Sequence, residues 1–280
     1  MNLLKEKLPW WAKMISKMII GRLGLTNLFL KLRIFDHGKN DFEREFQVFN
    51  KHFLAVKNHI PKNDFVVLEL GPGYSFSSAV FVHCFGGKLT YLVDQGDFVN
   101  KNHECRRFTA LIEFLKNKGI KSRGGINYKY LTDGLQSLKR ITSNSIDFIF
   151  SNAVIEHIKK NEFVPIMIEL KRILKENGVC SHEIDLKDHL EKSLEHLRFS
   201  EEFWERDIVY NSGFYTNRFR FSEIIKIFKD LGFKYKLIDL KKFNKLPINN
   251  KKINIRFRNL PESDLLISSF QILLFKNEEK

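Results

Sequence analysis

The sequence predicts an α/β protein with a mainly parallel seven-stranded sheet, an antiparallel hairpin at its C-terminal end and an N-terminal helical extension. From residue 64 onwards, short runs rich in β-branched and aromatic residues alternate with helical stretches. This alternation is typical of parallel strands joined by right-handed crossover helices. After the fifth run the alternation stops, and a basic loop joins the last two runs. A hydrophobic content of 43% in 280 residues agrees with a substantial core.

The elements follow from these runs. We expect strands at residues 65–70, 88–94, 126–131, 145–151, 178–184, 234–240 and 269–275. Helices should lie between the first five strands, for example over 104–118 and 162–176, and Asn177-Gly178 is a stop signal for the second of these. A further helix is expected over 221–231. The last two strands have no crossover helix between them and should therefore pair as an antiparallel hairpin.

The charge is unevenly distributed over two expected regions, an N-terminal helical extension at 1–60 and a domain at 61–280 with a substrate-side insertion at 185–220. The net charge is +14, and a basic surface can neutralise nucleic-acid phosphates. However, residues 1–40 carry eight Lys/Arg against two acids, and 241–260 carry seven against none. These two segments hold +13 of the charge, so the rest is nearly neutral and nucleic acid is not the expected partner.

The cysteines and the N-terminus indicate the compartment. Cys84, Cys105 and Cys180 fall in three different expected core elements, so they form neither a disulfide framework nor a metal knuckle. Such cysteines are typical of a reducing cytoplasm. The sequence contains no run of about 18 or more uncharged apolar residues, so we expect no membrane-spanning helix. Lys13 and Lys17 interrupt the apolar N-terminal stretch and no small-residue cleavage site follows, which argues against a signal peptide.

The N-terminal stretch 9–25, PWWAKMISKMIIGRLGL, places apolar side chains on one face of a helix and Lys13 and Lys17 on the other. Such a helix can pack on the sheet or cover the ligand site, and it can also lie on an anionic membrane surface. The basic loop at 241–258 could add to contact with that surface. The expected location is therefore the cytoplasm, with peripheral contact at the inner face of the membrane through residues 1–25.

The stretch VVLELGPGYS at 66–75 runs from an apolar strand into two glycines. Ligands of open parallel sheets bind at the carboxyl ends of strands. Gly71 and Gly73 let the backbone approach a ligand and adopt a positive φ. Glu69 would repel a phosphate and attract a cation, and the third glycine of a dinucleotide site is replaced by Phe76. The expected cofactor therefore carries positive charge and no phosphate, and S-adenosyl-L-methionine (SAM) meets both conditions.

These residues resemble a known family. Glu69-Leu-Gly-Pro-Gly73 is similar to motif I of class I SAM-dependent methyltransferases. Tyr91-Leu-Val-Asp94 resembles the second-strand acid of that family, which accepts both ribose hydroxyls, and Asp94 lies 21 residues beyond Gly73. The stretch 145–158 resembles the fourth-strand motif of the type 11-like, small-molecule branch of this family, and 169–178 resembles the helix and turn that follow it. The resemblance implies a Rossmann-like fold with SAM as methyl donor.

The remaining cofactor candidates each have a structural alternative. Asp94 could cap the next helix instead of binding ribose. Asp133 occupies the place where this family often has an acid near the adenine amino group, although a plain Asp-Gly turn would also explain it. The resemblance puts the backbone of Ser151 and Asn152 beside the methionine part of the cofactor. Ser-Asn could equally be a helix-capping turn.

The acceptor side is expected after the fourth and fifth strands. His157 could take a proton from a hydroxyl, or bind a neighbouring backbone carbonyl as a structural residue. Asp185, Asp188 and His189 could serve as general base, substrate ligands or a divalent-metal cluster. Alternatively, Asp185 or Asp188 caps a helix over 187–197. We expect His157 and His189 as bases, one of them oriented by Asp185 or Asp188, and no metal ligand.

The sequence therefore predicts SAM-dependent O-methylation of a small-molecule or carbohydrate acceptor. The segment after the fifth strand resembles methyltransferase-domain proteins of bacterial surface-glycan synthesis, which implies a role in polysaccharide biosynthesis. Arg218 and Arg220 could bind an anionic acceptor, although arginines at a helix start are usually solvated. A nucleic-acid methyltransferase is one alternative, but the fourth strand reads Ser-Asn-Ala-Val and lacks the Asn/Asp-Pro-Pro-aromatic motif. A binding or scaffold protein without catalysis is another.

Overall fold

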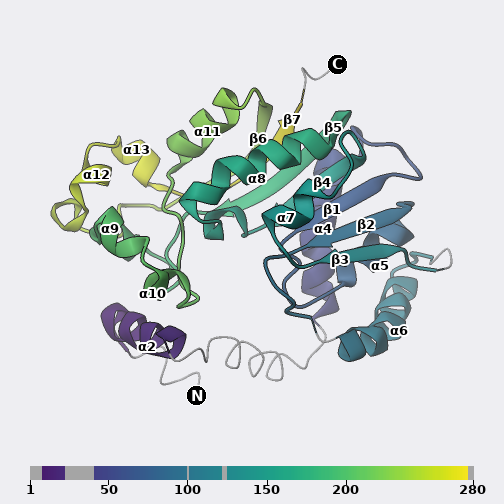
Figure 1. Cartoon of the computed structure of the whole chain (residues 1–280), viewed down its shortest axis with the longest axis horizontal. Coiled ribbons are helices and arrows are strands. Elements are labelled where there is room, and N and C mark those ends of the chain that lie inside the picture. The colour runs from purple at the N-terminus through teal and green to yellow at the C-terminus, as the bar shows by residue number, and fades with distance from the viewer. Residues whose placement is uncertain (1–7, 23–40, 100, 122–124, 277–280) are drawn as a thin grey trace.

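The computed structural model describes residues 8–22, 41–99, 101–121 and 125–276, with only the backbone at 101–103, 105 and 106. Within these ranges the chain forms a seven-stranded sheet of order β3-β2-β1-β4-β5-β7-β6 (Figure 1). The strands are β1 (Val66–Leu70), β2 (Leu89–Val93), β3 (Tyr128–Leu131), β4 (Ile146–Asn152), β5 (Leu174–Asp185), β6 (Lys234–Lys242) and β7 (Ile267–Phe275). The first five strands are parallel, whereas β7 runs antiparallel to both β5 and β6. The predicted fold class and C-terminal hairpin are confirmed.

Helices cover both faces of this sheet. The longer ones are α2 (Trp10–Arg22), α4 (Phe42–Val56), α5 (Ser77–Cys84), α6 (Lys101–Asn117), α7 (Leu135–Lys139), α8 (Lys160–Ile173) and α11 (Phe221–Asp230). Shorter turns of helix are η1 (Ile155–His157), η2 (Glu195–Arg198), α9 (Glu201–Trp204), α10 (Asp207–Tyr210), η3 (Asn250–Lys252), α12 (Ile255–Arg258) and α13 (Glu262–Leu265). Figure 1 shows α7 and α8 in front of the sheet and α4 and α5 behind it.

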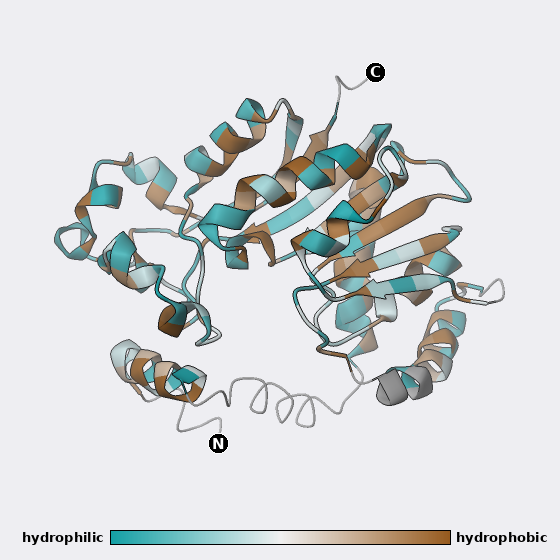
Figure 2. Cartoon of the chain, viewed as in Figure 1, coloured by the Kyte–Doolittle hydropathy of each residue, from teal (hydrophilic) through white to brown (hydrophobic). Residues whose placement is uncertain are grey.

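Two hydrophobic clusters fill the space between the layers. Side chains of α7, α8 and α11 pack on one face of the strands, and those of α4, α5 and α6 pack on the other. Phe148 and Phe150 of β4 face α4 and α5, whereas Ile149 faces the opposite cluster, because successive side chains of a strand alternate. In Figure 2 the central strands are predominantly hydrophobic, as burial on both faces requires.

The transition from α8 to β5 differs from the prediction. The helix ends at Ile173 and the strand begins at Leu174, which pairs with Ile146 of β4. The expected stop signal therefore lies inside the strand. A Cβ on Gly178 would lie 2.8 Å from Leu174 Cδ1 and 3.0 Å from the Ile146 carbonyl oxygen. Gly178 thus permits the close approach of β5 to β4 and does not end the helix.

The insertion at 185–220 packs against two distant segments. Trp204, Val209 and Phe214 form a buried cluster with Met14 of α2, and Figure 1 shows α2 lying beside α10. Leu197 packs in a second cluster with side chains of the loop between β6 and β7, which contains η3, α12 and α13. The helix expected over 187–197 does not form, and a turn followed by η2 replaces it. Residues 1–7 and 23–40 of the expected N-terminal extension lie outside the described residues.

Candidate active site

The carboxyl ends of β1, β2, β4 and β5 meet at one edge of the sheet. These strands are parallel, with Glu69 of β1 opposite Leu92 of β2 and Phe150 of β4. Asn152, the last residue of β4, is opposite Glu183 of β5. The motif I loop, Asp94, Ser151-Asn152 and Asp185 therefore lie along the same edge, where ligands of this fold class bind.

Gly71 and Gly73 have left-handed backbone conformations, with φ of 74° and 65°. A Cβ on Gly71 would lie 2.5 and 2.7 Å from the two Cγ atoms of Val154, so the fold itself requires this glycine. A Cβ on Gly73 would meet no atom of the described chain within 4 Å. Gly73 thus exposes its backbone to open space in which a ligand can sit.

Asp94 joins the motif I loop to the end of β2. Its carboxylate accepts hydrogen bonds from the Gly73 amide at 3.0 Å and from the Gln95 amide at 2.7 Å. Burial raises the pKa of Asp94, and these two amides oppose that shift. Each oxygen retains a further acceptor position, so the carboxylate can also bind a diol.

Glu69 has a carboxyl group that the protein leaves without full compensation. Its Oε2 is buried and has no hydrogen-bond partner within the described chain. Burial raises the pKa of Glu69 to about 8; a hydrogen bond from Ser78 lowers it, while Asp94 and Glu45 raise it further. A bound cation would stabilise the carboxylate. The orphaned oxygen and the open space beside Gly73 suit a cationic cofactor.

The loop after Gly73 is anchored by a network that the sequence analysis missed. The buried Glu104 of α6 accepts a hydrogen bond from the Phe76 amide at 2.8 Å. Arg107 binds Glu104 at 2.7 Å, Ser75 Oγ at 3.1 Å and both oxygens of Glu45 in α4 at 2.7 and 2.9 Å. The Glu104–Arg107 spacing was visible in the sequence, but Glu45 is 62 residues from Arg107.

The other cofactor candidates make local contacts. Asp133 is exposed and forms an ion pair with Arg140, so its carboxylate links the two ends of α7. Ser151 is buried, and its Oγ is 2.8 Å from His182 Nδ1. Asn152 is half-buried at the end of β4. The side chain of Ser151 is therefore engaged within the core, and its backbone is the part that can contact a ligand.

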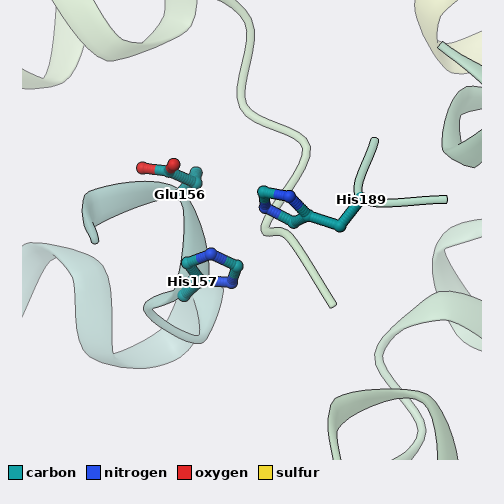
Figure 3. Close-up of side chains that lie close together, drawn as sticks. All are labelled: Glu156, His157 and His189. Atoms are coloured by element: carbon teal, nitrogen blue, oxygen red, sulfur yellow. The ribbon is translucent and has the colours of Figure 1, made fainter. Parts of the chain in front are cut away.

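Glu156, His157 and His189 come together beyond the carboxyl ends of β4 and β5, where the sequence analysis expected the acceptor (Figure 3). Their carboxylate and ring-nitrogen atoms lie within 4.8 Å of one another. The two imidazole rings are stacked, with centroids 4.6 Å apart and planes inclined by 17°. His157 Nδ1 donates to the Tyr215 carbonyl oxygen at 2.8 Å, so its Nε2 is the acceptor nitrogen of the neutral ring.

Burial controls the protonation of this group. Burial lowers the pKa of His157. It is also the main reason that the pKa of His189 is lowered to about 4, and the charge of the neighbouring His157 lowers that pKa further. Burial raises the pKa of Glu156 to about 8, and the amides of Glu156 and Asp185 offset this only in part. Near neutral pH the site therefore holds two uncharged imidazoles beside a carboxyl group with little tendency to ionise.

Residues 68–181 match the family described as "Methyltransferase domain". The match begins inside β1, ends inside β5, and includes the motif I loop, Asp94 and Ser151-Asn152. The protein is a class I SAM-dependent methyltransferase. SAM is accordingly its methyl donor. The resemblance seen in the sequence is thus confirmed at the level of the family.

Solved structures of similar fold are distant from this methyltransferase. A SAM-dependent methyltransferase from Methanosarcina mazei is 15% identical, with a TM-score of 0.49, over 80% of this chain and 98% of that one. Phosphoethanolamine N-methyltransferase 2 from Haemonchus contortus is 18% identical, with a TM-score of 0.44, over 82% of this chain and 53% of that one. An arsenic(III) SAM methyltransferase from Chlamydomonas reinhardtii is 14% identical, with a TM-score of 0.44, over 77% of this chain and 64% of that one. No curated protein matches the chain.

Asp188 of this methyltransferase has a structural role. It is buried, and its two carboxylate oxygens accept hydrogen bonds from the backbone amides of Leu190, Glu191, Ser193 and Glu195. These bonds hold the turn that carries His189, so Asp188 supports that turn and its oxygens are not placed to act as a base. Asp185 is half-buried and binds the amide of Lys187 at 2.9 Å and its Nζ at 2.8 Å.

Asn217 positions the η1 turn, a role that sequence reasoning missed. Its backbone amide donates to the Glu156 carbonyl oxygen at 2.7 Å. Its side-chain Nδ2 donates to the carbonyl oxygens of Ile155 at 2.9 Å and Ile158 at 3.1 Å. The residue is buried. Together with the Tyr215 carbonyl, Asn217 fixes the η1 backbone and the His157 ring of this methyltransferase.

The expectation that Arg218 and Arg220 bind an anionic acceptor is wrong, and so is the alternative that they are solvated. Both are buried. Arg218 donates to backbone carbonyls in the insertion and to Glu201, and Arg220 donates to the carbonyls of Leu186, Asp264, Leu265 and Ile267. These guanidinium groups tie the irregular segments together.

Proposed function

We propose that this methyltransferase transfers a methyl group to a hydroxyl oxygen of a small-molecule acceptor, of carbohydrate type. The observation that carries the proposal is the stacked, uncharged pair of His157 and His189 in the turns that follow β4 and β5. An alcohol is a weak nucleophile until its proton is removed, whereas a neutral amine needs no such help. A neutral imidazole is the side chain suited to accept that proton near neutral pH.

For the cofactor, we infer that Glu69, Gly71, Gly73 and Asp94 form the main contacts. Asp94 would bind the ribose hydroxyls, and Gly73 would allow the close approach of the ligand. We infer that Asp133, Ser151 and Asn152 border the site, the last two through their backbone. When bound, SAM supplies an electrophilic methyl group on a positively charged sulfur, which the Glu69 carboxylate can stabilise.

The chain's own residues then handle the acceptor and its proton. His157 Nε2, or His189 in its place, takes the hydroxyl proton, and Asp185 lies close enough to stabilise the resulting imidazolium. The acceptor oxygen forms a bond to the methyl carbon as the carbon–sulfur bond breaks, and the electron pair of that bond stays on sulfur. Proton removal contributes about 10²–10⁴ in rate, and fixed orientation of the reactants about 7–11 kcal/mol.

The test is turnover with a panel of monosaccharides, nucleotide sugars and phenols, followed by S-adenosylhomocysteine release and mass spectrometry of the product. We expect an O-methylated product. Of the two variants His157→Asn and His189→Asn, the one that removes the base should lower kcat by about 10² or more. The affinity for S-adenosylhomocysteine should remain unchanged in both. An N-methylated product, or full activity in the His157→Asn/His189→Asn double variant, would contradict the proposal.

We also infer that the protein acts in the cytoplasm at the inner face of the membrane, on an acceptor of polysaccharide biosynthesis. None of the described helices is long and apolar enough to cross a membrane. Helix α2 nevertheless leaves an outer face of Trp11, Ile15 and Ile19 exposed by 53%, 48% and 55%, while Met14 packs inward. The helix contains basic residues and no acidic ones. These features support docking on an anionic lipid surface.

A further inference from the structure

We propose that Glu156, His157 and His189 form a binding site for a divalent first-row metal ion, for which Zn²⁺ and Mn²⁺ are the best matched. The sequence analysis expected no metal ligand, and the cluster it weighed consisted of Asp185, Asp188 and His189. The structure leaves only His189 of that set in position, because the Asp188 oxygens are engaged by backbone amides. Glu156 and His157 take the place of the two aspartates.

The donor atoms have the number, chemistry and proximity that such a site needs. One carboxylate and two imidazoles lie with their ligand atoms within 4.8 Å of one another. One carboxylate with two histidines is the ligand set of several catalytic zinc sites and of non-haem iron sites. Glu156 and His157 come from η1, which follows β4, and His189 comes from the turn after β5 (Figure 3). Adjacent parallel strands thus deliver the three ligands to one place.

Glu156 provides an independent observation. The residue is only 2% exposed. The amides of Glu156 and Asp185 are near enough to lower its pKa, but neither carboxylate oxygen accepts a hydrogen bond of normal geometry in the part of the chain that the structure describes. A buried carboxyl group without a partner costs free energy unless a cation or a donor compensates it. His189 Nε2 is also buried without a partner among the described residues. A bound cation would satisfy both groups at once.

The surroundings orient the ligands as metal sites require. His157 donates its Nδ1 proton to the Tyr215 carbonyl, which leaves Nε2 as the ligand atom and fixes the plane of the ring. Histidine ligands of metals almost always have such an outer-shell acceptor. Asn217 holds the η1 backbone through three hydrogen bonds. The site is therefore supported on the His157 side before any ion binds.

The nearby charges act in both directions. Lys17 of α2 and Lys187 oppose a cation, whereas Asp185 attracts one. When a bound ion has displaced the proton of Glu156, the charges of Glu156 and Asp185 balance those of the two lysines, so the affinity depends mainly on the three ligands. Lys187 is moreover paired with Asp185 at 2.8 Å.

A metal at this position would give the site a more specific chemistry, and this step rests on the proposed function. Three protein ligands leave at least one coordination position open, as in catalytic zinc sites. An acceptor hydroxyl bound there would lose its proton more readily. The preferred substrates would then be acceptors with two neighbouring oxygens, such as vicinal diols, which can chelate the ion. The histidines would act as ligands and the proton would pass to solvent or to Asp185.

The experiment is isothermal titration of Zn²⁺, Mn²⁺ and Mg²⁺ into the full-length protein after treatment with a chelator. We expect one ion per chain with micromolar affinity or better for Zn²⁺ or Mn²⁺. Glu156→Gln and His189→Asn should each weaken binding by about tenfold or more. His59→Asn is the matched control, because His59 packs beside Phe275, away from the site. Titration of S-adenosylhomocysteine into each variant verifies that it is folded.

Two results would overturn the inference: no binding of any of the three ions by a wild-type protein that binds S-adenosylhomocysteine, or equal affinity in the wild type, Glu156→Gln and His189→Asn. The second result would mean adventitious surface binding only. Turnover separates this inference from the proposed function. Methyl transfer to oxygen that persists in excess chelator would contradict a role for the metal and leave the proposed function intact. Metal binding without O-methylation of any acceptor would contradict the proposed function and leave the metal site intact.

Discussion

Gly71 and Gly73 adopt nearly the same backbone conformation but differ in what surrounds them. Both have φ in the left-handed region, where a side chain costs about 1–2 kcal/mol. Val154 occupies the space beside Gly71, whereas the space beside Gly73 is open among the described residues. One glycine is therefore required by the packing of the loop after β1 against the turn after β4, and we infer that the other leaves room for the ligand.

The two glycines should therefore respond differently to alanine. Gly71→Ala should lower the free energy of unfolding by about 2–5 kcal/mol, from steric overlap and backbone strain together. Gly73→Ala should cost about 1–2 kcal/mol but weaken S-adenosylhomocysteine binding by about tenfold, a change of about 1.4 kcal/mol. Gly119→Ala is the control, since Gly119 has φ of 78° and open space around its Cβ position. Chemical denaturation and calorimetry measure both quantities; equal cofactor affinity in Gly73→Ala and Gly119→Ala would refute the assignment.

Glu69 makes cofactor binding depend on pH. Its pKa is raised from 4.5 to about 8, chiefly by burial, so between these values the folded protein holds a proton that the unfolded chain has released. The stability of the ligand-free protein therefore falls as pH rises through this range. A cationic ligand favours the carboxylate, so its affinity should increase over the upper part of the same range.

We expect SAM affinity to rise by about tenfold between about pH 6.5 and about pH 8.5. Glu69→Gln keeps the shape of the side chain and removes its titration, so the increase should disappear in this variant. Comparing the two proteins cancels the titration of the ligand's own groups. Calorimetry at several pH values provides the measurement. Parallel pH profiles for wild type and Glu69→Gln would show that the carboxylate does not face the bound cation.

At the scale of elements, α4, α5 and α6 meet at the Glu45–Arg107–Glu104 network beside the motif I loop. The Arg107 side chain is only 10% exposed and bridges two carboxylates. Removing one partner from a buried ionic network leaves uncompensated charge, which typically costs about 3–5 kcal/mol. The network thus couples the N-terminal helix layer to the position of the Ser75–Ser77 turn.

Arg107→Met should accordingly destabilise the protein by about 3 kcal/mol and weaken cofactor binding, because the Phe76 amide would lose a fixed acceptor. Arg206→Met removes an exposed pair with Glu202, in which the side chains are 58% and 86% exposed, and should cost less than about 1 kcal/mol. Urea denaturation and calorimetry compare the two variants. If both variants lost the same small amount of stability and kept full affinity, the network would have no role in holding the loop.

Local patterns predicted the elements well because each strand and helix carries its own periodicity. All strand ends lie within two residues of the prediction except the start of β5, where pairing of Leu174 with Ile146 prevails over the helical pattern. The contacts of Asn217, Arg218 and Arg220 were not predictable. They depend on an insertion whose irregular backbone is held by side chains distant in sequence.

The candidate site divides in the same way. Motif I and Asp94 were recognisable because one loop and one strand end carry them. Glu156 was overlooked as a ligand because the run Ala153-Val-Ile-Glu-His-Ile158 does not show where its carboxyl group points, and its burial follows only from the segments folded over η1. His157 and His189, both named from the sequence, are 32 residues apart in the chain and come into contact because they follow adjacent strands.

At the scale of the whole molecule, α2 joins the insertion on its inner face and leaves an apolar stripe on its outer face. Trp10, Met14 and Met18 pack toward the insertion, and Lys13 pairs with Glu191 at 2.6 Å. A surface helix usually exposes a polar face, whereas α2 has apolar side chains on both its buried and its exposed face. Insertion of the outer stripe into the boundary of an anionic bilayer would bury it and place the methyltransferase next to membrane-associated acceptors.

We therefore expect the full-length protein to bind vesicles of phosphatidylserine and phosphatidylcholine more tightly than vesicles of phosphatidylcholine alone. The variant with serine at Trp11, Ile15 and Ile19 should lose about fivefold or more of this affinity, because apolar insertion and charge attraction act together. A matched control replaces Leu54, Leu237 and Ile238, which are 50%, 40% and 42% exposed on α4 and β6. Co-sedimentation measures binding, and S-adenosylhomocysteine titration verifies each fold. Equal binding by the two triple variants would assign any membrane contact to surface charge and leave the stripe on α2 without this role.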